Sequence, residues 1–191
     1  MIAPSELIIN PDGSCFHLHL KPEQLADKII MVGDPDRVNT VASYFDTKEC
    51  EVSSREFHTI TGTYKGKRIT TLSHGIGTDN IDIVLNELDA LANIDFASRT
   101  IKPEFRQLTM VRVGTSGGLQ PFVPVGTYVA AGKSIGFDGV LYFYAGSEEV
   151  RDKAFESELI RQLEWKLNDI KPYVVSADPS LVEQITQNDI I

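Results

Sequence analysis

The sequence predicts an α/β protein with a mixed, mostly parallel central sheet flanked by helices. Short apolar segments alternate with segments of helical periodicity, and glycine-rich loops follow several of the apolar segments. The 191 residues are enough to bury a substantial core. Hydrophobic residues make up 42% of the chain and charged residues 24%, as in globular proteins. We therefore expect one domain over residues 1–191.

The first predicted elements are a strand, a turn and a helix. KIIMV at 28–32 is a short apolar run, and Gly-Asp-Pro follows it as a turn. Pro35 suits the first turn of a helix, which we expect to continue to about Tyr44. Residues 56–73 predict two further strands, joined by a tight Lys-Gly turn.

The clearest helix is predicted at residues 79–92. From Ile81 onward, apolar residues recur there at i, i+3, i+4 and i+7 and form one stripe. LTMVRV at 108–113 then predicts a buried strand, and GTYVAAG at 126–132 predicts another. Together these segments continue the alternation of strands and helices.

The last part of the chain predicts two helices separated by a strand. Ser147 can cap a helix whose apolar residues continue to Leu167 at i+4 spacing. PYVV at 172–175 predicts a short strand, and a last helix is expected from Pro179 to about Gln187. The alternation of elements along the chain favours a sheet with parallel strands.

Glycine-rich loops follow three of the predicted strands, at residues 33–37, 74–78 and 114–118. In open α/β sheets, ligands bind beyond the carboxyl ends of the strands. Gly33 allows a ligand to approach the backbone, and the N-terminus of the next helix offers N–H groups to an anion. Arg37 can reach back over this loop. An ordinary turn with a solvated arginine is an equal alternative.

The loop RVGTSGG, from Arg112 to Gly118, predicts a phosphate cradle. Arg112 stands in an apolar strand, where an unpaired charge is costly, so we expect it to have an anionic partner. Thr115 and Ser116 add hydroxyl donors, and the glycines expose backbone amides. The alternative is an edge strand whose arginine pairs with a structural carboxylate.

Composition and motif spacing exclude several classes of protein. The net charge is −9, without the basic footprint of a nucleic-acid-binding protein. No apolar run is long enough to span a membrane, and the start lacks the features of a secretory signal. Two cysteines make no disulfide framework. We therefore expect a cytoplasmic protein with neither a nucleic-acid nor a membrane partner.

Metal binding and nucleophilic catalysis find little support in the spacing. His17 and His19 alternate in an extended segment, but His58 and His74 complete no zinc-type pattern. A hydrogen-bonding or structural histidine is the better interpretation of His17. From spacing alone, Arg55 is best interpreted as an ordinary surface residue. The sequence contains no G-x-S-x-G elbow.

An ordered set of motifs resembles the nucleoside phosphorylase family, in particular its uridine phosphorylase branch. The set comprises FHLxL near the start, GDPDRV, SREF, GIG before a helix ending in NEL, RVGTSGGLQ, a PVG segment and GFDG. The resemblance implies a nucleoside phosphorylase-like sheet flanked by helices. It also implies reversible phosphorolysis, in which uridine and phosphate give uracil and ribose 1-phosphate. Inorganic phosphate would be a co-substrate, and no cofactor or metal is implied.

The resemblance also implies a site shared between subunits. The residues it assigns to phosphate are Gly33, Arg37, Arg55, Arg112 and Thr115, of which Arg37, Arg112 and Thr115 would act in catalysis. The residues it assigns to the nucleoside are His17, Ser116 and Gly117. Arg55 and His17 would reach in from a neighbouring subunit, where His17 would bind the ribose 5′-hydroxyl. The resemblance therefore implies a homo-oligomer, either a dimer or a ring of dimers.

In the family, the chain continues beyond the point at which this sequence stops. The continuing part carries the base-recognising Gln and Arg loop and the Met-Glu element that grips the ribose, so we expect a C-terminally incomplete domain. HGIGTDN also differs from uridine phosphorylases around GIG. The alternatives are a phosphorylase or nucleosidase for purine nucleosides, and a truncated, non-catalytic phosphate-binding or assembly module. Three phosphate-facing arginines speak against a nucleosidase, because a hydrolase has no phosphate to hold.

Overall fold

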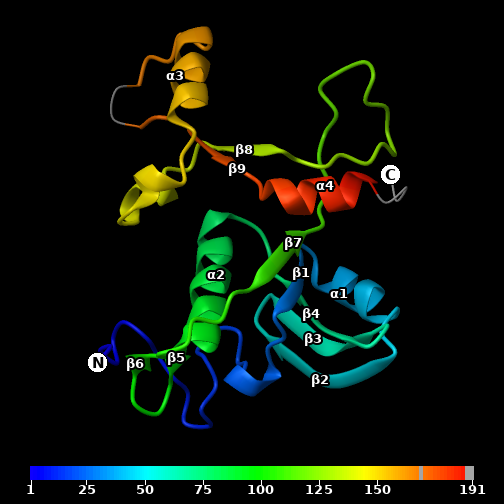
Figure 1. Ribbon diagram of the computed structural model, residues 1–191, viewed down its shortest axis with the longest axis vertical. Helices are drawn as coiled ribbons and strands as arrows, with labels where there is room; N and C mark the ends of the chain where they lie inside the picture. The colour runs from blue at the N-terminus through cyan, green and yellow to red at the C-terminus, as the bar shows by residue number, and fades with distance from the viewer. Residues whose placement is uncertain (168–169, 188–191) are drawn as a thin grey trace. The chain divides into compact units, whose positions relative to one another are not determined.

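The computed structural model describes residues 1–167 and 170–187, and the chain falls into two compact units (Figure 1). The first unit is Met1–Ser116 and the second is Gly117–Ile191. The single domain expected over residues 1–191 stays a prediction.

The first unit contains a five-stranded sheet in the order β2-β3-β4-β1-β7. Its strands are β1 (Lys28–Val32), β2 (Thr47–Ser54), β3 (Phe57–Tyr64), β4 (Lys67–Ser73) and β7 (Thr109–Arg112). β1 pairs in parallel with β4 and β7, whereas β2, β3 and β4 pair antiparallel. The predicted mixed sheet is confirmed, and its parallel half is the part formed by β4, β1 and β7.

Two helices, α1 (Pro35–Ala42) and α2 (Thr78–Asn93), cover opposite faces of this sheet. Ile29 of β1 belongs to the core cluster that includes Leu88 of α2, and Val32 of β1 packs in a second cluster with Val38 of α1. Successive residues of a strand point to opposite faces, so one strand supplies both clusters. The helix predicted at 79–92 is confirmed, and α1 ends two residues before Tyr44.

Shorter elements complete the first unit. A 3₁₀ turn, η1 (Pro22–Gln24), precedes β1, and a small hairpin of β5 (Ile94–Asp95) and β6 (Thr100–Ile101) follows α2. The hairpin leads the chain from the end of α2 back to β7.

The second unit is built on a two-stranded antiparallel ribbon. The strands are β8 (Lys133–Gly136) and β9 (Tyr173–Ser176), and the helices are α3 (Lys153–Gln162) and α4 (Pro179–Gln187). Two 3₁₀ turns, η2 (Val140–Phe143) and η3 (Ser147–Glu149), lie between β8 and α3. The predicted strand at 172–175 and the last helix from Pro179 to Gln187 are confirmed.

The structure corrects three expected elements and adds one strand. Residues 126–132 form no strand, because Gly126 adopts a φ of +91° and Thr127 closes a turn onto the Pro124 carbonyl. Ser147 begins only a 3₁₀ turn, and Asp152 caps α3 by accepting a hydrogen bond from the Phe155 amide. The strand predicted as buried at 108–113 is an edge strand with exposed side chains. β2 was not expected, because its charged, half-exposed sequence gives no apolar signal.

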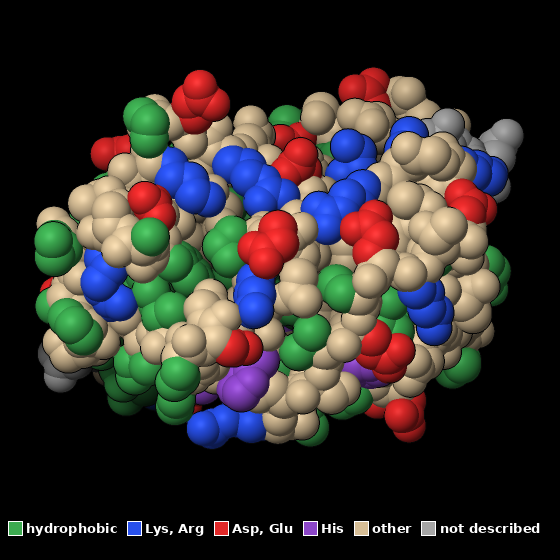
Figure 2. All heavy atoms as spheres, turned by 90° about the horizontal axis from the view of Figure 1, so that it is seen from below, with side chains coloured by type: hydrophobic (Ala, Val, Ile, Leu, Met, Phe, Trp, Pro, Cys, Tyr) green, Lys and Arg blue, Asp and Glu red, His purple; other side chains and the backbone are tan. Residues whose placement is uncertain are grey.

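On the face drawn in Figure 2, basic and acidic side chains are interspersed. Within residues 1–167 and 170–187, no helix combines the length and the apolar character needed to cross a membrane.

Candidate active site

The site lies at the carboxyl edge of the parallel strands of the first unit. Because β4, β1 and β7 run in the same direction, the chain leaves all three at one edge of the sheet (Figure 1). An open pocket of about 890 Å³ lies there. The residues around it that bear on the chemistry are Gly33, Arg37, Glu56, His74, Asn80 and Arg112.

The loop after β1 brings Arg37 to the pocket. Asp34 caps α1 by accepting a hydrogen bond from the Asp36 amide at 2.9 Å, and the Asp34 carbonyl accepts one from the Arg37 amide at 3.1 Å. The sequence predicted that amides at this helix N-terminus bind an anion. The amides of Asp36 and Arg37 instead already donate to Asp34. The half-buried Arg37 side chain is the cationic contribution of this loop.

Gly33 forms part of the pocket wall between Arg37 and His74. A Cβ atom on Gly33 would lie 3.8 Å from His74 Cε1 and 3.9 Å from Arg37 Nη2. Such an atom would be in van der Waals contact with both side chains and would cover the backbone between them. That a ligand approaches the backbone at this glycine stays a prediction.

The loop after β4 is closely packed against the residues that line the pocket. Gly75 has a φ of +66°, and a Cβ there would lie 2.8 Å from Asn80 Nδ2 and 2.9 Å from Glu56 Cγ. Ser73 fixes the approach of Glu56, because its hydroxyl donates to the Glu56 carbonyl at 2.8 Å. A larger residue at position 75 would therefore displace the side chains that line this part of the pocket.

Arg112 reaches the pocket from the end of β7, but its surroundings differ from those expected. It is exposed rather than buried, and its Nε–H donates to Nε2 of His74 at 2.9 Å. The expected structural carboxylate is replaced by an imidazole. The guanidinium folds back over Gly114, where any side chain would collide with it. The outer nitrogens of Arg112 are the ones left to meet a ligand.

His74 is the buried group of the site. Burial lowers its pKa, the nearby Arg112 and Arg37 charges lower it further, and the adjoining backbone of Gly75 opposes them. The ring is therefore held in its neutral form, which can accept the hydrogen bond from Arg112.

The remaining residues of the RVGTSGG loop do not line this pocket. Thr115 and Ser116 are exposed, and Gly117 begins the second unit. The roles that the resemblance assigns to these three residues stay predictions.

Arg55 and His17 lie together in a separate cluster. Arg55, in a left-handed conformation with φ +56° between β2 and β3, lies over the Phe16 ring at 5.7 Å. The same ring packs edge-on against His17 at 4.8 Å. The buried carboxylate of Glu87 accepts from His17 Nδ1 at 2.7 Å and from the amides of His17 and Leu18. Glu87 therefore fixes the orientation of the histidine ring.

Sequence reasoning missed His74 and Glu87 as site residues. His74 is the first residue after β4 and precedes a glycine loop, a position from which a side chain reaches the carboxyl edge. Glu87 is a charged residue beside the apolar stripe of α2, next to Leu88. A carboxylate on a buried helix face requires several hydrogen-bond donors. A glutamate at such a position in the sequence therefore indicates a specific hydrogen-bonding partner.

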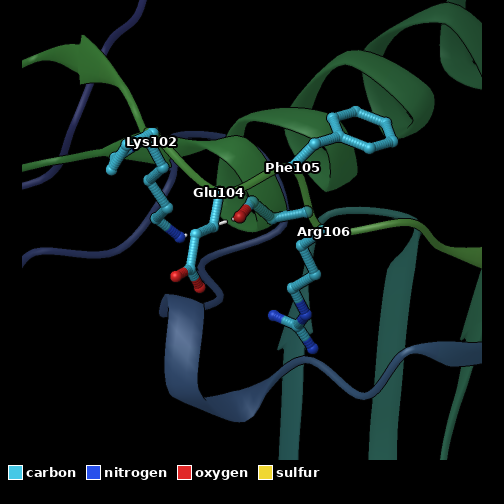
Figure 3. A pocket seen from close by; sticks show the side chains of 6 residues that line it. Lys102, Glu104, Phe105 and Arg106 are labelled. Atoms are coloured by element: carbon cyan, nitrogen blue, oxygen red, sulfur yellow. Dashed lines mark hydrogen bonds between the residues drawn. The ribbon is translucent and has the colours of Figure 1, made fainter.

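A second pocket, shown in Figure 3, is lined by residues 102–106 and Ala92. Lys102 donates to the carbonyls of Leu91 and Ala92 at the end of α2. Arg106 pairs with Asp27 at 2.6 Å, and the Phe105 ring points away from both cations in Figure 3. These cations already have structural partners, so the pocket at the carboxyl edge is the better anion site.

The chain is therefore an α/β protein whose candidate site places two arginines at the carboxyl edge of its parallel strands. Comparison with known proteins gives the family: the chain belongs to the Phosphorylase superfamily, whose family profile matches residues 27–189.

Individual relatives include both uridine and purine nucleoside phosphorylases. A uridine phosphorylase of Thermococcus kodakarensis is 30% identical over 137 residues, which are 72% of this chain and 44% of that protein. A DeoD-type purine nucleoside phosphorylase of Levilactobacillus brevis is 37% identical over 116 residues, 60% of this chain and 44% of that protein. The crystal structure of a Trypanosoma brucei nucleoside phosphorylase, described as showing uridine phosphorylase activity, matches with a TM-score of 0.81 and 34% identity, over 95% of this chain and 61% of that one.

The chain spans less than two thirds of the length of these relatives. It is therefore similar to one part of a nucleoside phosphorylase, the part that includes the pocket of Gly33, Arg37 and Arg112.

Proposed function

We propose that the protein acts in the reversible phosphorolysis of a pyrimidine nucleoside, with uridine and phosphate giving uracil and ribose 1-phosphate. The observation that carries the proposal is that Arg112, at the end of β7, and Arg37, in the first turn of the helix after β1, line one pocket beside Gly33. A guanidinium fork suits a phosphate oxygen pair, and two such forks at one pocket suit a dianion.

The proposed chemistry needs no protein nucleophile. A phosphate oxygen attacks C1′, and the C1′–N bond breaks with its electron pair leaving on the base, which then takes up a proton. Holding phosphate beneath C1′ replaces a bimolecular encounter by a positioned attack. The positive charge that develops on the sugar is stabilised by the phosphate itself, which Arg37 and Arg112 keep in place.

We further propose that Arg55 and His17 complete the pocket of a neighbouring subunit. The cluster of Arg55, Phe16 and His17 does not line the pocket of its own chain, which supports this arrangement. With Nδ1 committed to Glu87, the His17 ring has Nε2 for a sugar hydroxyl. Mixing Arg37→Ala and Arg55→Ala chains tests this, because some mixed oligomers would contain one intact site and regain activity. Mixtures as inactive as either variant alone would contradict it.

Purine nucleosides are the second candidate substrates. DeoD-type purine nucleoside phosphorylases are as similar to this chain as uridine phosphorylases are. The two candidates separate in one assay, in which uridine and inosine are supplied with phosphate and the release of uracil and hypoxanthine is followed. Faster release of hypoxanthine would transfer the proposal to purines. Release of either base at the same rate without phosphate would indicate a nucleosidase.

Measuring phosphate binding tests the pocket without requiring turnover. It also tests the alternative that the chain is a non-catalytic phosphate-binding module. Arg112→Ala removes a charge-assisted contact worth about 2–3 kcal/mol, so isothermal titration should show phosphate affinity falling by roughly 30- to 150-fold. Arg161→Ala is the matched control, because it removes one positive charge from an exposed ion pair with Glu158 in the second unit. Equal phosphate affinity in Arg112→Ala and Arg161→Ala would refute the assigned role. Phosphate binding without nucleoside binding would favour the non-catalytic module.

A further inference from the structure

We propose that His74 is a positioning residue that holds Arg112 through its Nε2 lone pair, so that both outer nitrogens of the guanidinium face the phosphate. The inference rests on the proposed phosphate-binding function of the pocket and assigns a role to a residue that neither the resemblance nor the spacing singled out.

The contact fixes the tautomer of the ring. Arg112 can only donate, so the His74 Nε2 that it meets at 2.9 Å must carry a lone pair. In a neutral imidazole the proton is then on Nδ1. Arg112 uses its Nε–H for this contact. Nη1 and Nη2 therefore remain available as two parallel N–H donors, which match two oxygens of a phosphate.

His74 is rigid enough to act as an anchor. The residue is only 2% exposed, and its backbone amide donates to the Val32 carbonyl at 2.9 Å, which continues the β1–β4 pairing by one residue. The guanidinium also lies against Gly114, where a Cβ atom would collide with Nη1, Cζ and Nη2. Arg112 is therefore confined between an imidazole acceptor and a backbone without a side chain.

The ring is also kept in the state that the contact requires. Nδ1 is buried and has no hydrogen-bond partner in the described structure, so no carboxylate there stabilises a protonated ring. Burial and the charges of Arg112 and Arg37 lower the pKa of His74. A protonated ring would lose its acceptor and repel Arg112. A neutral acceptor leaves the full positive charge of Arg112 for the ligand, whereas a carboxylate partner would compete with phosphate for it.

The first experiment compares three variants of the full chain by isothermal titration with inorganic phosphate. His74→Leu removes the acceptor and keeps an apolar side chain in a buried position, so we expect about tenfold weaker binding. His74→Gln keeps an acceptor oxygen at a similar reach and should bind within about twofold of the unaltered protein. Thr71→Val on the same strand removes a buried hydroxyl without a partner and is the packing control.

Each outcome bears on the inference. If the unaltered protein binds no phosphate, the proposed function itself fails. If it binds phosphate and His74→Leu binds equally well, the inference alone is overturned. A His74→Gln variant as weak as His74→Leu would also overturn it, because the acceptor would then not be what matters. Circular dichroism of each variant confirms that the fold is retained.

A second experiment tests whether His74 acts through Arg112. Arg112→Lys keeps a positive charge but has no Nε–H, so adding His74→Leu to it should change phosphate affinity by less than about twofold. A further tenfold loss would mean that His74 acts on the ligand by another route. Nitrogen-15 NMR of the histidine rings supplies a readout independent of binding: His74 should show the Nδ1–H tautomer at neutral pH. An Nε2–H tautomer or a protonated ring would contradict the proposed contact.

Discussion

The two units of the chain are stabilised in different ways. The first unit has an apolar core that includes the fully buried Phe57, Leu72 and Leu88. Among the described residues of the second unit, the buried ones are Ser147, Glu156, Pro172 and Val174. Arg151 binds Glu156 there with two guanidinium nitrogens, at 2.9 and 2.7 Å, and stacks on Tyr142. A non-directional apolar core organises one unit, and a directional ion pair organises the other.

This difference explains where the candidate site can be precise. His74 directly follows β4, whose Leu72 is buried in the core, so the core beneath it fixes its position. Arg112 ends the exposed edge strand β7 and is held in place by its hydrogen bond to His74. Many large apolar side chains of the second unit are exposed, among them Leu119, Phe122, Val125 and Phe143. We therefore expect the first unit to contribute most of the apolar stabilisation and to hold the pocket.

The largest effect should come from a cavity in the core of the first unit. Leu88 is fully buried on α2, and Leu88→Ala should lower the free energy of unfolding of this unit by about 3 kcal/mol. Leu163→Ala removes the same atoms from a half-exposed residue of the second unit and should cost less than about 1 kcal/mol. Urea unfolding followed by amide hydrogen exchange measures both. Equal losses for the two variants would remove the contrast between the units.

A slightly smaller effect should follow when the ion pair of the second unit is broken. Glu156→Gln leaves Arg151 partly buried beside a neutral amide and weakens the acceptor of the Val174 amide, so we expect a loss of about 2–3 kcal/mol confined to this unit. Trp165, the one tryptophan of the sequence, stacks on Phe137 and reports the unfolding of this unit by fluorescence.

The control for that variant is Glu158→Gln on the same helix. Glu158 pairs with Arg161 at an exposed position, where an ion pair contributes little. If the fluorescence midpoint moved equally for Glu156→Gln and Glu158→Gln, burial of the Arg151–Glu156 pair would not be what stabilises this unit.

The contrast between the units also separates what the sequence predicts from what it does not. The first unit has strong local signals: the apolar run before Gly33, the stripe on α2 and the Lys-Gly turn all correspond to observed elements. In the second unit, Gly126 turns the chain where an apolar alternation predicted a strand. A positive φ at glycine depends on packing that the local pattern does not encode.

The candidate site follows the same division. Gly33, Arg37 and Arg112 could be predicted, because each stands at or within five residues of the end of a strand and the parallel order brings those ends together. The contact of Arg112 with His74 could not, because it joins residues 38 positions apart and depends on side-chain conformation. The cluster of Arg55 and His17 likewise depends on the Phe16 ring between them.

The next prediction concerns a buried polar contact in the first unit, that of Glu87. Glu87→Gln should weaken the hydrogen bonds to the His17 and Leu18 amides, because a neutral amide oxygen is a poorer acceptor than a carboxylate. We expect a loss of about 1–2 kcal/mol, seen as faster hydrogen exchange at these two amides while Leu88 keeps its protection. Loss of protection throughout the unit would show that Glu87 is part of the core stability and not a local anchor.

The smallest effect should be a difference in acid sensitivity between the units. The pKa of His74 is lowered by burial and by Arg112, so the stability that its neutral form provides is complete above the ordinary histidine pKa and is lost as pH falls below about 6.5. For Glu156, burial raises the pKa, but the hydrogen bonds from Arg151 and the Val174 amide outweigh it and lower the pKa. Its contribution is therefore lost only as pH falls below about 4.5. Between pH 6.5 and 5, the first unit should lose stability at no more than about 1.4 kcal/mol per pH unit from this one group. His74→Gln should reduce that slope in hydrogen exchange, while the Trp165 midpoint of the second unit stays level. An unchanged slope in His74→Gln would mean that the neutral imidazole is not what ties the stability of this edge to pH.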